Sequence, residues 1–179
     1  MTPVGQPLVL EHVVLPQEAR LWGAGRPAYP DEPPAPAAVE IGVRAWRDLG
    51  VDVVVSLIED WEVPRRAPAL FEAVAERGIR LIRFPVADFG TPTDVAAFAA
   101  LLSEVGGQLA RGEDVLVHCN AGLGRTAVVL ASLLRAHGFA GDAVQEIRRI
   151  YRPGAMETPI QEAFVRDLAV AQKGGTRTS

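Results

Sequence analysis

The residues best suited to chemistry lie between 114 and 126, where the sequence reads DVLVHCNAGLGRT. A short apolar run ends at His118 and Cys119, a glycine-containing loop follows, and Arg125 and Thr126 lead into a run rich in alanine, valine and leucine. The pattern predicts a strand, a loop and the N-terminus of a helix. Glycines let consecutive N–H groups point into such a loop, the helix terminus adds partial positive charge, and arginine can bind two oxygens. We therefore expect a phosphate site.

Cys119 is the residue of this loop that can react. A single cysteine is more often a small apolar core residue than a nucleophile. Here, however, it follows a predicted buried strand and is separated from Arg125 by five residues, so its sulfur should face the same space as the loop N–H groups. The helix terminus and the arginine both favour the thiolate form. A thiolate held against a bound phosphate can accept the phosphoryl group.

The pattern His-Cys-x5-Arg-Thr resembles the signature of the protein tyrosine phosphatase superfamily, and the chain is similar to its small atypical dual-specificity members. The resemblance implies that Cys119 is the nucleophile that forms a phosphocysteine and that Arg125 binds the phosphate and its transition state. It also implies that His118 orients the thiol and helps to ionise it, and that Thr126 donates a hydroxyl proton to the leaving thiolate. The implied phosphate-binding loop comprises Asn120, Ala121, Gly122, Leu123, Gly124 and Arg125.

Two further segments extend the resemblance. The stretch P-V-A-D-F-G-T-P-T looks like the general-acid loop of dual-specificity phosphatases, which makes Asp88 the acid that protonates the leaving group. The other interpretation of this aspartate is a turn or helix-cap residue, but Asp94 fits the cap better. The stretch R-P-G-A-M-E-T-P-I-Q resembles the segment in which a glutamine positions the hydrolytic water, a role that falls to Gln161. We interpret Glu59, in the run S-L-I-E, as a buried structural carboxylate.

The remaining sequence predicts the elements that position these residues. Strands are expected at 51–58, 79–86 and 115–117, and helices at 37–49, 67–77, 125–137 and 158–172. A further helix is expected from Thr91 or Thr93 to about Arg111, and another ends at Tyr151. Strands that alternate with helices predict an α/β fold with a central, mostly parallel sheet of about five strands flanked by helices on both faces.

The N-terminal part gives weaker signals. Residues 8–22 are expected to form an edge hairpin or two short strands, and Gly23–Gly25 a turn. The proline-rich stretch 26–36 is either an ordered surface loop or a mobile flap.

Composition limits the class of protein. The chain of 179 residues, 49% apolar and 22% charged, is expected to form a single domain over 1–179, with 173–179 as a flexible tail. A net charge of −4 favours neither nucleic acid nor a membrane as partner. The absence of a signal-peptide pattern and of a membrane-length apolar run indicates a cytoplasmic protein, which we expect to be a monomer. The single cysteine excludes an intramolecular disulfide.

These features predict a metal-independent protein phosphatase of the dual-specificity or tyrosine type, with a phosphocysteine intermediate and no cofactor. Its substrate would be a phosphorylated protein or a small phosphomonoester. Two alternatives stay open: a phosphatase of a small non-protein phosphate, and a catalytically silent module that binds phosphate. The silent module is disfavoured because Cys119, Asp88, Arg125 and Gln161 are all present. The absence of lysine from the loop disfavours a substrate with many phosphates.

Overall fold

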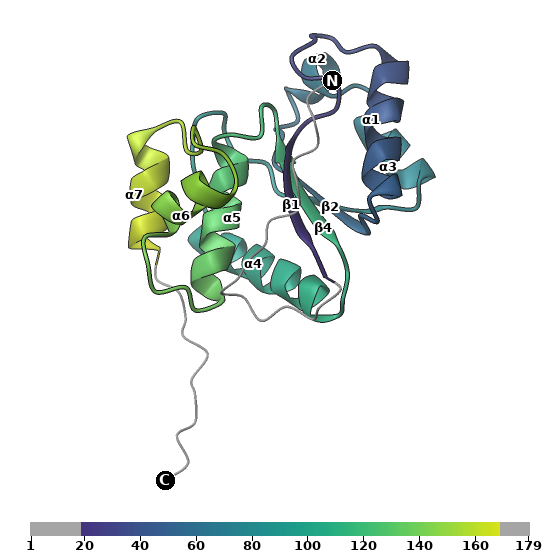
Figure 1. Ribbon diagram of the computed structural model, residues 1–179. Helices are drawn as coiled ribbons and strands as arrows, with labels where there is room; N and C mark the ends of the chain where they lie inside the picture. Colours follow the sequence, from purple (N-terminus) through teal and green to yellow (C-terminus); the bar gives the residue numbers. More distant parts are fainter. Residues whose placement is uncertain (1–18, 169–179) are drawn as a thin grey trace.

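The computed structural model describes residues 19–168 and shows an α/β fold around a four-stranded parallel sheet (Figure 1). The strands are β1 (Leu21–Gly25), β2 (Val53–Ser56), β3 (Arg80–Arg83) and β4 (Val115–Cys119), in the spatial order β1-β4-β2-β3. All the pairings are parallel. The predicted α/β class is therefore confirmed, and the predicted strand number of about five is corrected to four within the described residues.

Helices cover both faces of the sheet, as predicted (Figure 1). One face carries α1 (Pro36–Asp48) and α3 (Leu70–Glu76), and the other carries α4 (Val95–Ala110) and α5 (Arg125–Ala136). Both α6 (Ala143–Ile150) and α7 (Pro159–Asp167) pack against α5, and the single turn α2 (Val63–Arg66) follows β2.

The central strands explain the unbroken apolar runs of the sequence. Every residue of β2 and β4 is buried, and successive side chains enter the two separate core clusters on opposite faces of the sheet. Val53 and Val55 join one cluster, and Val54 joins the other. A parallel strand covered on both faces carries mainly apolar residues, and the two buried polar residues, Ser56 and His118, lie towards the carboxyl ends of β2 and β4.

Local capping signals set several helix boundaries. The carboxylate of Asp94 accepts the N–H of Ala97 at 2.9 Å, which confirms Asp94 as the cap of α4. The hydroxyl of Thr158 accepts the N–H of Gln161 at 3.3 Å, with Pro159 as the first residue of α7. The predicted extension of this helix beyond 168 lies outside the described residues.

The edge strand differs from the prediction. Most of the predicted hairpin at 8–22 lies outside the described residues, and the turn predicted at Gly23–Gly25 is wrong because these residues form the end of β1 beside β4. A Cβ on Gly23 would lie 2.8 Å from the ring of Tyr151, and one on Gly25 would lie 3.0 Å from the carbonyl oxygen of Ala121. The glycines allow close packing against these groups rather than a turn.

The topology brings the chemistry-bearing loops to one edge of the sheet. In parallel strands the carboxyl ends share an edge, and ligands of open α/β sheets bind there. The loops after β2, β3 and β4 all start at this edge (Figure 1). Among residues 19–168, no helix combines the length and the apolar character needed to cross a membrane.

Candidate active site

The loop after β4 forms the predicted cradle around Cys119. Cys119 is the last residue of β4 and is buried, and its sulfur accepts the N–H of Gly122 at 3.3 Å. Gly122 has a φ of 77°, and a Cβ there would lie 2.4 Å from the backbone nitrogen of Gly25. Only glycine satisfies both conditions. Gly124 then caps α5, so the loop ends at a helix N-terminus as predicted.

Neighbouring segments hold the loop from outside. The buried Arg26 donates from Nε to Oδ1 of Asn120 at 2.7 Å, and its backbone N–H donates to the carbonyl of Asn120 at 2.9 Å. On the other side the hydroxyl of Tyr151 donates to the carbonyl of Gly122 at 2.6 Å. The proline-rich stretch that begins at Arg26 is therefore ordered, and its first residue is hydrogen-bonded to the loop after β4.

His118 lies beneath the loop as a neutral side chain. Its Nδ1 lies 3.1 Å from the carbonyl oxygen of Cys119, which can only accept, so Nδ1 carries the proton. The ring is fully buried, 5.4 Å from the ring of Trp46, and Nε2 has no hydrogen-bond partner among residues 19–168. Burial lowers the pKa of His118 to about 4. The imidazole thus fixes the backbone of Cys119; its influence on the thiol stays a prediction.

Arg125 is buried and held by a bidentate ion pair. Its Nη1 donates to Oε2 of Glu62 at 2.7 Å, its Nη2 donates to Oε1 at 3.1 Å, and Nη1 also donates to the carbonyl of Val86 at 2.9 Å. Both side chains are almost fully shielded from solvent. Burial alone would raise the pKa of Glu62, but the hydrogen bonds from Arg125, the backbone and Arg66 outweigh burial and lower it. Glu62 is therefore ionised and fixes the arginine.

Glu62 is the main site residue that sequence analysis missed. Glu59, interpreted as the buried carboxylate, is only half-buried, whereas Glu62 is completely buried. The unpredicted turn α2 folds the chain back so that the carboxylate of Glu62 accepts the backbone N–H of Glu59 at 2.9 Å. One signal in the sequence could have indicated this turn. Glu62 and Arg66 are four residues apart, the spacing of an ion pair on a helix, and Pro64 between them is typical of the first turn of a helix.

Asp88 lies next to Arg125, where the sequence placed the general acid. Its Oδ1 lies 2.9 Å from Nη2 of Arg125, and its Oδ2 accepts from Nη1 of Arg66 at 2.8 Å. Arg66 also binds Glu62 at 2.5 Å and Glu32 of the proline-rich stretch at 2.9 Å. Asp88, Arg125 and the proline-rich stretch are therefore linked by one ion-pair network through Arg66.

The structure also places the other two predicted residues near the loop. Gln161 is fully buried, donates from Nε2 to the carbonyl of Gly90 at 3.1 Å, and accepts the N–H of Glu157 at 2.9 Å. It thus joins the acid loop to the segment before α7. The hydroxyl of Thr126 donates to the carbonyl of Ala24 at 3.4 Å. The roles of both residues in the reaction stay predictions.

Glu157 is a second acidic side chain at the loop that the sequence did not single out. A Cβ on Gly124 would lie 2.5 Å from its Oε2. Partial burial and the negative charge of Asp88 raise the pKa of Glu157, while Arg125 and a hydrogen bond from the backbone of Gly124 oppose this. The balance favours the protonated form of the Glu157 carboxyl group.

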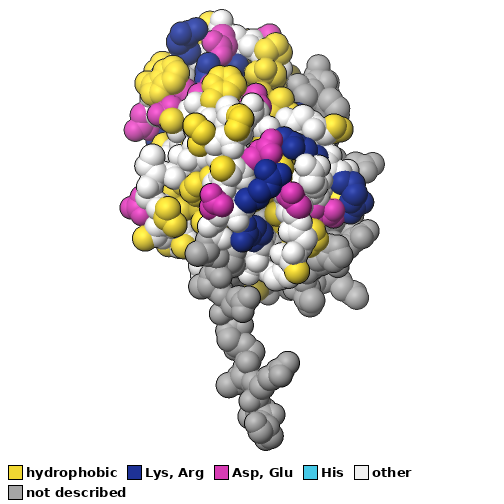
Figure 2. Space-filling model, turned by 90° about the vertical axis from the view of Figure 1, so that its left-hand side faces the viewer, with side chains coloured by type: hydrophobic (Ala, Val, Ile, Leu, Met, Phe, Trp, Pro, Cys, Tyr) yellow, Lys and Arg dark blue, Asp and Glu magenta, His cyan; other side chains and the backbone are white. Residues whose placement is uncertain are grey.

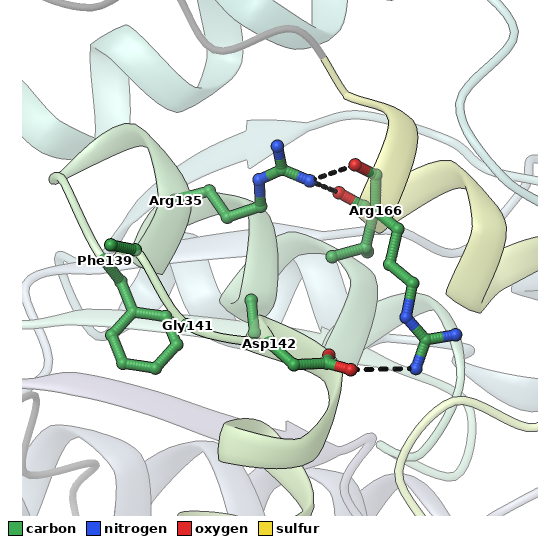
Figure 3. Close-up of a pocket in the computed structure, with 8 residues that line it drawn as sticks. Arg135, Phe139, Gly141, Asp142 and Arg166 are labelled. Carbon is green, nitrogen blue, oxygen red and sulfur yellow. Dashed lines mark hydrogen bonds and ion pairs between the residues drawn. The ribbon is translucent and has the colours of Figure 1, made fainter.

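A separate hollow of about 470 Å³ lies near the opposite end of α5 (Figure 3). It is lined in part by Arg135, Phe139, Asp142 and Arg166, and none of residues 118–126 contributes to it. It is therefore not part of the cysteine site. Within residues 19–168, no group of three His, Cys, Asp or Glu side chains is arranged to hold a metal ion.

Comparison with known proteins agrees with this geometry. The family model described as "Polymorphic toxin system, DSP-PTPase phosphatase" matches residues 30–139. Cyclin-dependent kinase inhibitor 3 of Homo sapiens is 31% identical over 109 residues, which cover 58% of this chain and 50% of that protein. An uncharacterized protein of Methanocaldococcus jannaschii is 29% identical over 114 residues, covering 64% of this chain and 63% of that protein. The chain spans about half the length of the human relative.

Solved structures cover more of the chain. The kinase associated phosphatase, crystallised with its catalytic-site cysteine replaced by serine, has a TM-score of 0.78 at 25% identity and covers 92% of this chain and 93% of its own. Tk-PTP in its active form has a TM-score of 0.66 at 26% identity and covers 94% of this chain and 97% of its own. The similarity therefore extends from the loop to nearly the whole fold.

Proposed function

The chain belongs to the family of DSP-PTPase phosphatases described for polymorphic toxin systems, and on that premise we propose that it is a cysteine-dependent phosphomonoesterase of the dual-specificity or tyrosine type. One observation carries the proposal. The predicted acid Asp88 lies 2.9 Å from Arg125, the arginine that ends the loop around the buried Cys119. The nucleophile, the phosphate-binding group and the proton donor thus meet at one point.

The arrangement suits a reaction in two steps. The thiolate of Cys119 attacks phosphorus, the bond from phosphorus to the leaving oxygen breaks, and protonated Asp88 gives that oxygen its proton. Asp88 then takes a proton from a water held by Gln161, and the resulting attack on phosphorus releases phosphate and the thiolate. Arg125 and the loop N–H groups stabilise the charge on the equatorial oxygens in both steps.

A phosphorylated protein is the substrate class that the relatives favour. The names cyclin-dependent kinase inhibitor 3 and kinase associated phosphatase connect those proteins with kinases, and both resemble this chain. A small non-protein phosphomonoester is the second candidate, and the loop without lysine disfavours only substrates with many phosphates. We also propose a cytoplasmic monomer. It binds neither nucleic acid nor membranes, and the net charge of −4 supports this second point.

The proposed function is tested with para-nitrophenyl phosphate. We expect hydrolysis that persists in a metal chelator, is inhibited by vanadate, and has a bell-shaped pH profile of kcat/KM with a mildly acidic optimum. The bell shape follows because the thiolate and the protonated form of Asp88 must be present together. Activity that needs a divalent metal, or that rises steadily to about pH 9, would exclude the mechanism. A folded protein that binds vanadate without turnover would indicate the silent module.

A further inference from the structure

Surface ion pairs are common on this protein, and each contributes little by itself. Basic and acidic side chains lie beside one another on the side that carries α7 (Figure 2). Arg166 and Asp142 form a pair of this kind, with 44% and 42% of their side chains exposed. Pairs between exposed groups are worth about 0–1 kcal/mol. A functional role is better indicated by a pair that is shielded from solvent and holds a reacting group.

Arg66 forms such a pair with Asp88, the general acid of the proposed reaction. Its Nη1 donates to Oδ2 of Asp88 at 2.8 Å and to Oε1 of Glu62 at 2.5 Å, and its Nε donates to Oε1 of Glu32 at 2.9 Å. Only 20% of the Arg66 side chain is exposed. Burial alone would lower the pKa of Arg66, but the hydrogen bonds to Asp88 and Glu62 outweigh burial and raise it. Arg66 is therefore charged and is held by three carboxylates.

Arg66 and Arg125 hold the same two carboxylates. Arg125 lies 2.9 Å from Oδ1 of Asp88 and donates to Oε2 of Glu62 at 2.7 Å. Together the four side chains form a closed ring in which positive and negative charges alternate. Each oxygen of the Asp88 carboxylate is bound to a different arginine, so rotation of this carboxylate would break both contacts. The ring thus fixes the direction in which Asp88 points.

The acid loop is held on its other side by contacts to its backbone. The hydroxyl of Thr158 donates to the carbonyl of Phe89 at 3.2 Å, and Nε2 of Gln161 donates to the carbonyl of Gly90 at 3.1 Å. These contacts fix the chain after Asp88 but leave the side-chain torsions of Asp88 free. Its carboxylate therefore needs support of its own.

Two side chains in the described part of the chain bind the carboxylate of Asp88, namely Arg66 and Arg125. The proposed function assigns Arg125 to the phosphate and its transition state, and it assigns nothing to Arg66. Arg66 contacts the reacting groups through Asp88, and it supports Arg125 only indirectly, through Glu62. The two routes can be separated, because only the first affects proton transfer to the leaving group.

We infer that Arg66 is a positioning residue that holds the carboxyl group of Asp88 where it can protonate the leaving oxygen. The inference rests on the proposed function and deepens it by naming the residue that aims the general acid. A general acid must lie within hydrogen-bond reach of the oxygen that it protonates. A misplacement of about 1 Å can cost about 10²-fold in rate.

The test uses two substrates of similar shape. Phenyl phosphate and para-nitrophenyl phosphate share a ring, but phenol is much the poorer leaving group and depends more on the proton. The readout is the ratio of kcat/KM for phenyl phosphate to kcat/KM for para-nitrophenyl phosphate. A loss of folded protein, or a weaker hold on Arg125, lowers both values together and leaves their ratio unchanged.

The variants are Arg66→Gln, Arg66→Lys, Asp88→Ala, the double variant of Arg66→Gln with Asp88→Ala, and the control Arg65→Gln. Arg65 precedes Arg66 in the chain, is 72% exposed, and pairs with Glu32 at 3.1 Å. The control therefore removes the same charge and a contact with the same outer carboxylate, but it leaves the bond between Arg66 and Asp88 in place.

Asp88→Ala should lower the ratio by about 10²-fold or more, and Arg66→Gln should lower it by about tenfold. Arg66→Lys should recover part of the loss, because an ammonium keeps the charge but lacks the planar fork of a guanidinium. Arg65→Gln should keep the wild-type ratio, and the double variant should match Asp88→Ala, because Arg66 acts through Asp88. A wild-type ratio in Arg66→Gln, an equal fall in Arg65→Gln, or a further fall in the double variant would overturn the inference.

The proposed function is scored separately, from the turnover of para-nitrophenyl phosphate by the wild type. An active wild type whose ratio does not depend on Arg66 removes the inference and leaves the proposed function standing. A wild type that hydrolyses neither substrate removes both.

Discussion

The buried ion pair between Glu62 and Arg125 offers a quantitative test of how the site is held. The change Glu62→Gln keeps the size of the side chain and removes its charge. The new amide NH₂ group can only donate, and it would face the N–H groups of Arg125 and Arg66, which also only donate. The variant thus leaves a buried guanidinium with reduced compensation.

The expected cost follows from burial. Removing one partner of a buried pair costs about 3–5 kcal/mol, because the remaining charge stays desolvated. Asp88 still lies 2.9 Å from Nη2 of Arg125 and compensates part of that charge. We therefore expect a loss near 3 kcal/mol, which corresponds to about 1–2 M in the urea midpoint at a typical m-value.

Urea unfolding followed by tryptophan fluorescence measures this loss, and Glu59→Gln is the control. Glu59 is half-buried and lies three residues away in the same segment, so its variant should stay within about 0.5 kcal/mol of the wild type. The pKa of Glu62 is lowered below 4.5 in the fold, so its stabilisation is present above that pH and is lost as the pH falls through the folded value. The difference between Glu62→Gln and the wild type should therefore shrink in acid.

A double variant separates charge from packing. Adding Arg125→Met to Glu62→Gln removes the stranded cation, so the pair of changes should cost less than the sum of the single ones. Equal losses for Glu62→Gln and Glu59→Gln, or strictly additive effects in the double variant, would refute the idea that a buried ion pair fixes Arg125.

Three further predictions concern other parts of the site. Replacing Asp88 by Ala should slow hydrolysis of alkyl phosphates by about 10²–10⁴-fold and of nitrophenyl phosphate much less, and equal losses would remove it from the acid role. Folding lowers the pKa of His118 from 6.5 to about 4, so the unfolded chain binds this proton first and the wild type loses about 3 kcal/mol of stability as the pH falls between these values. In urea unfolding, His118→Asn should therefore lose less stability than the wild type between pH 7 and 4. Gly122→Ala should destabilise the fold and weaken vanadate binding more than Gly112→Ala, since both glycines have positive φ but only Gly122 lacks room for a Cβ; comparable effects in the two variants would contradict this.

The parts of the fold and site that depend on local sequence could be predicted. The apolar run before Cys119 and the glycines after it define a strand and a loop within a few residues of one another, and Thr158 caps its helix through a neighbouring N–H. In such cases the residue and its partner are close in sequence, so the pattern contains the information.

Features that depend on contacts between residues distant in sequence could not be predicted. Glu62 was missed because its burial results from the turn α2 and from Arg125, which lies 63 residues further along the chain. The prediction of a turn at Gly23 was wrong because the reason for a glycine there is distant in sequence. The ring of Tyr151 packs against Gly23 and leaves no room for a Cβ. Tertiary packing decides all of these.

The most direct test of the central claim is capture of the phosphorylated nucleophile. The wild type is mixed with para-nitrophenyl phosphate, quenched in acid within its first turnovers and digested for mass spectrometry. We expect one added phosphoryl group on the peptide that contains Cys119, and neither the adduct nor turnover in Cys119→Ser. Full turnover by Cys119→Ser, or an adduct on another residue, would contradict it.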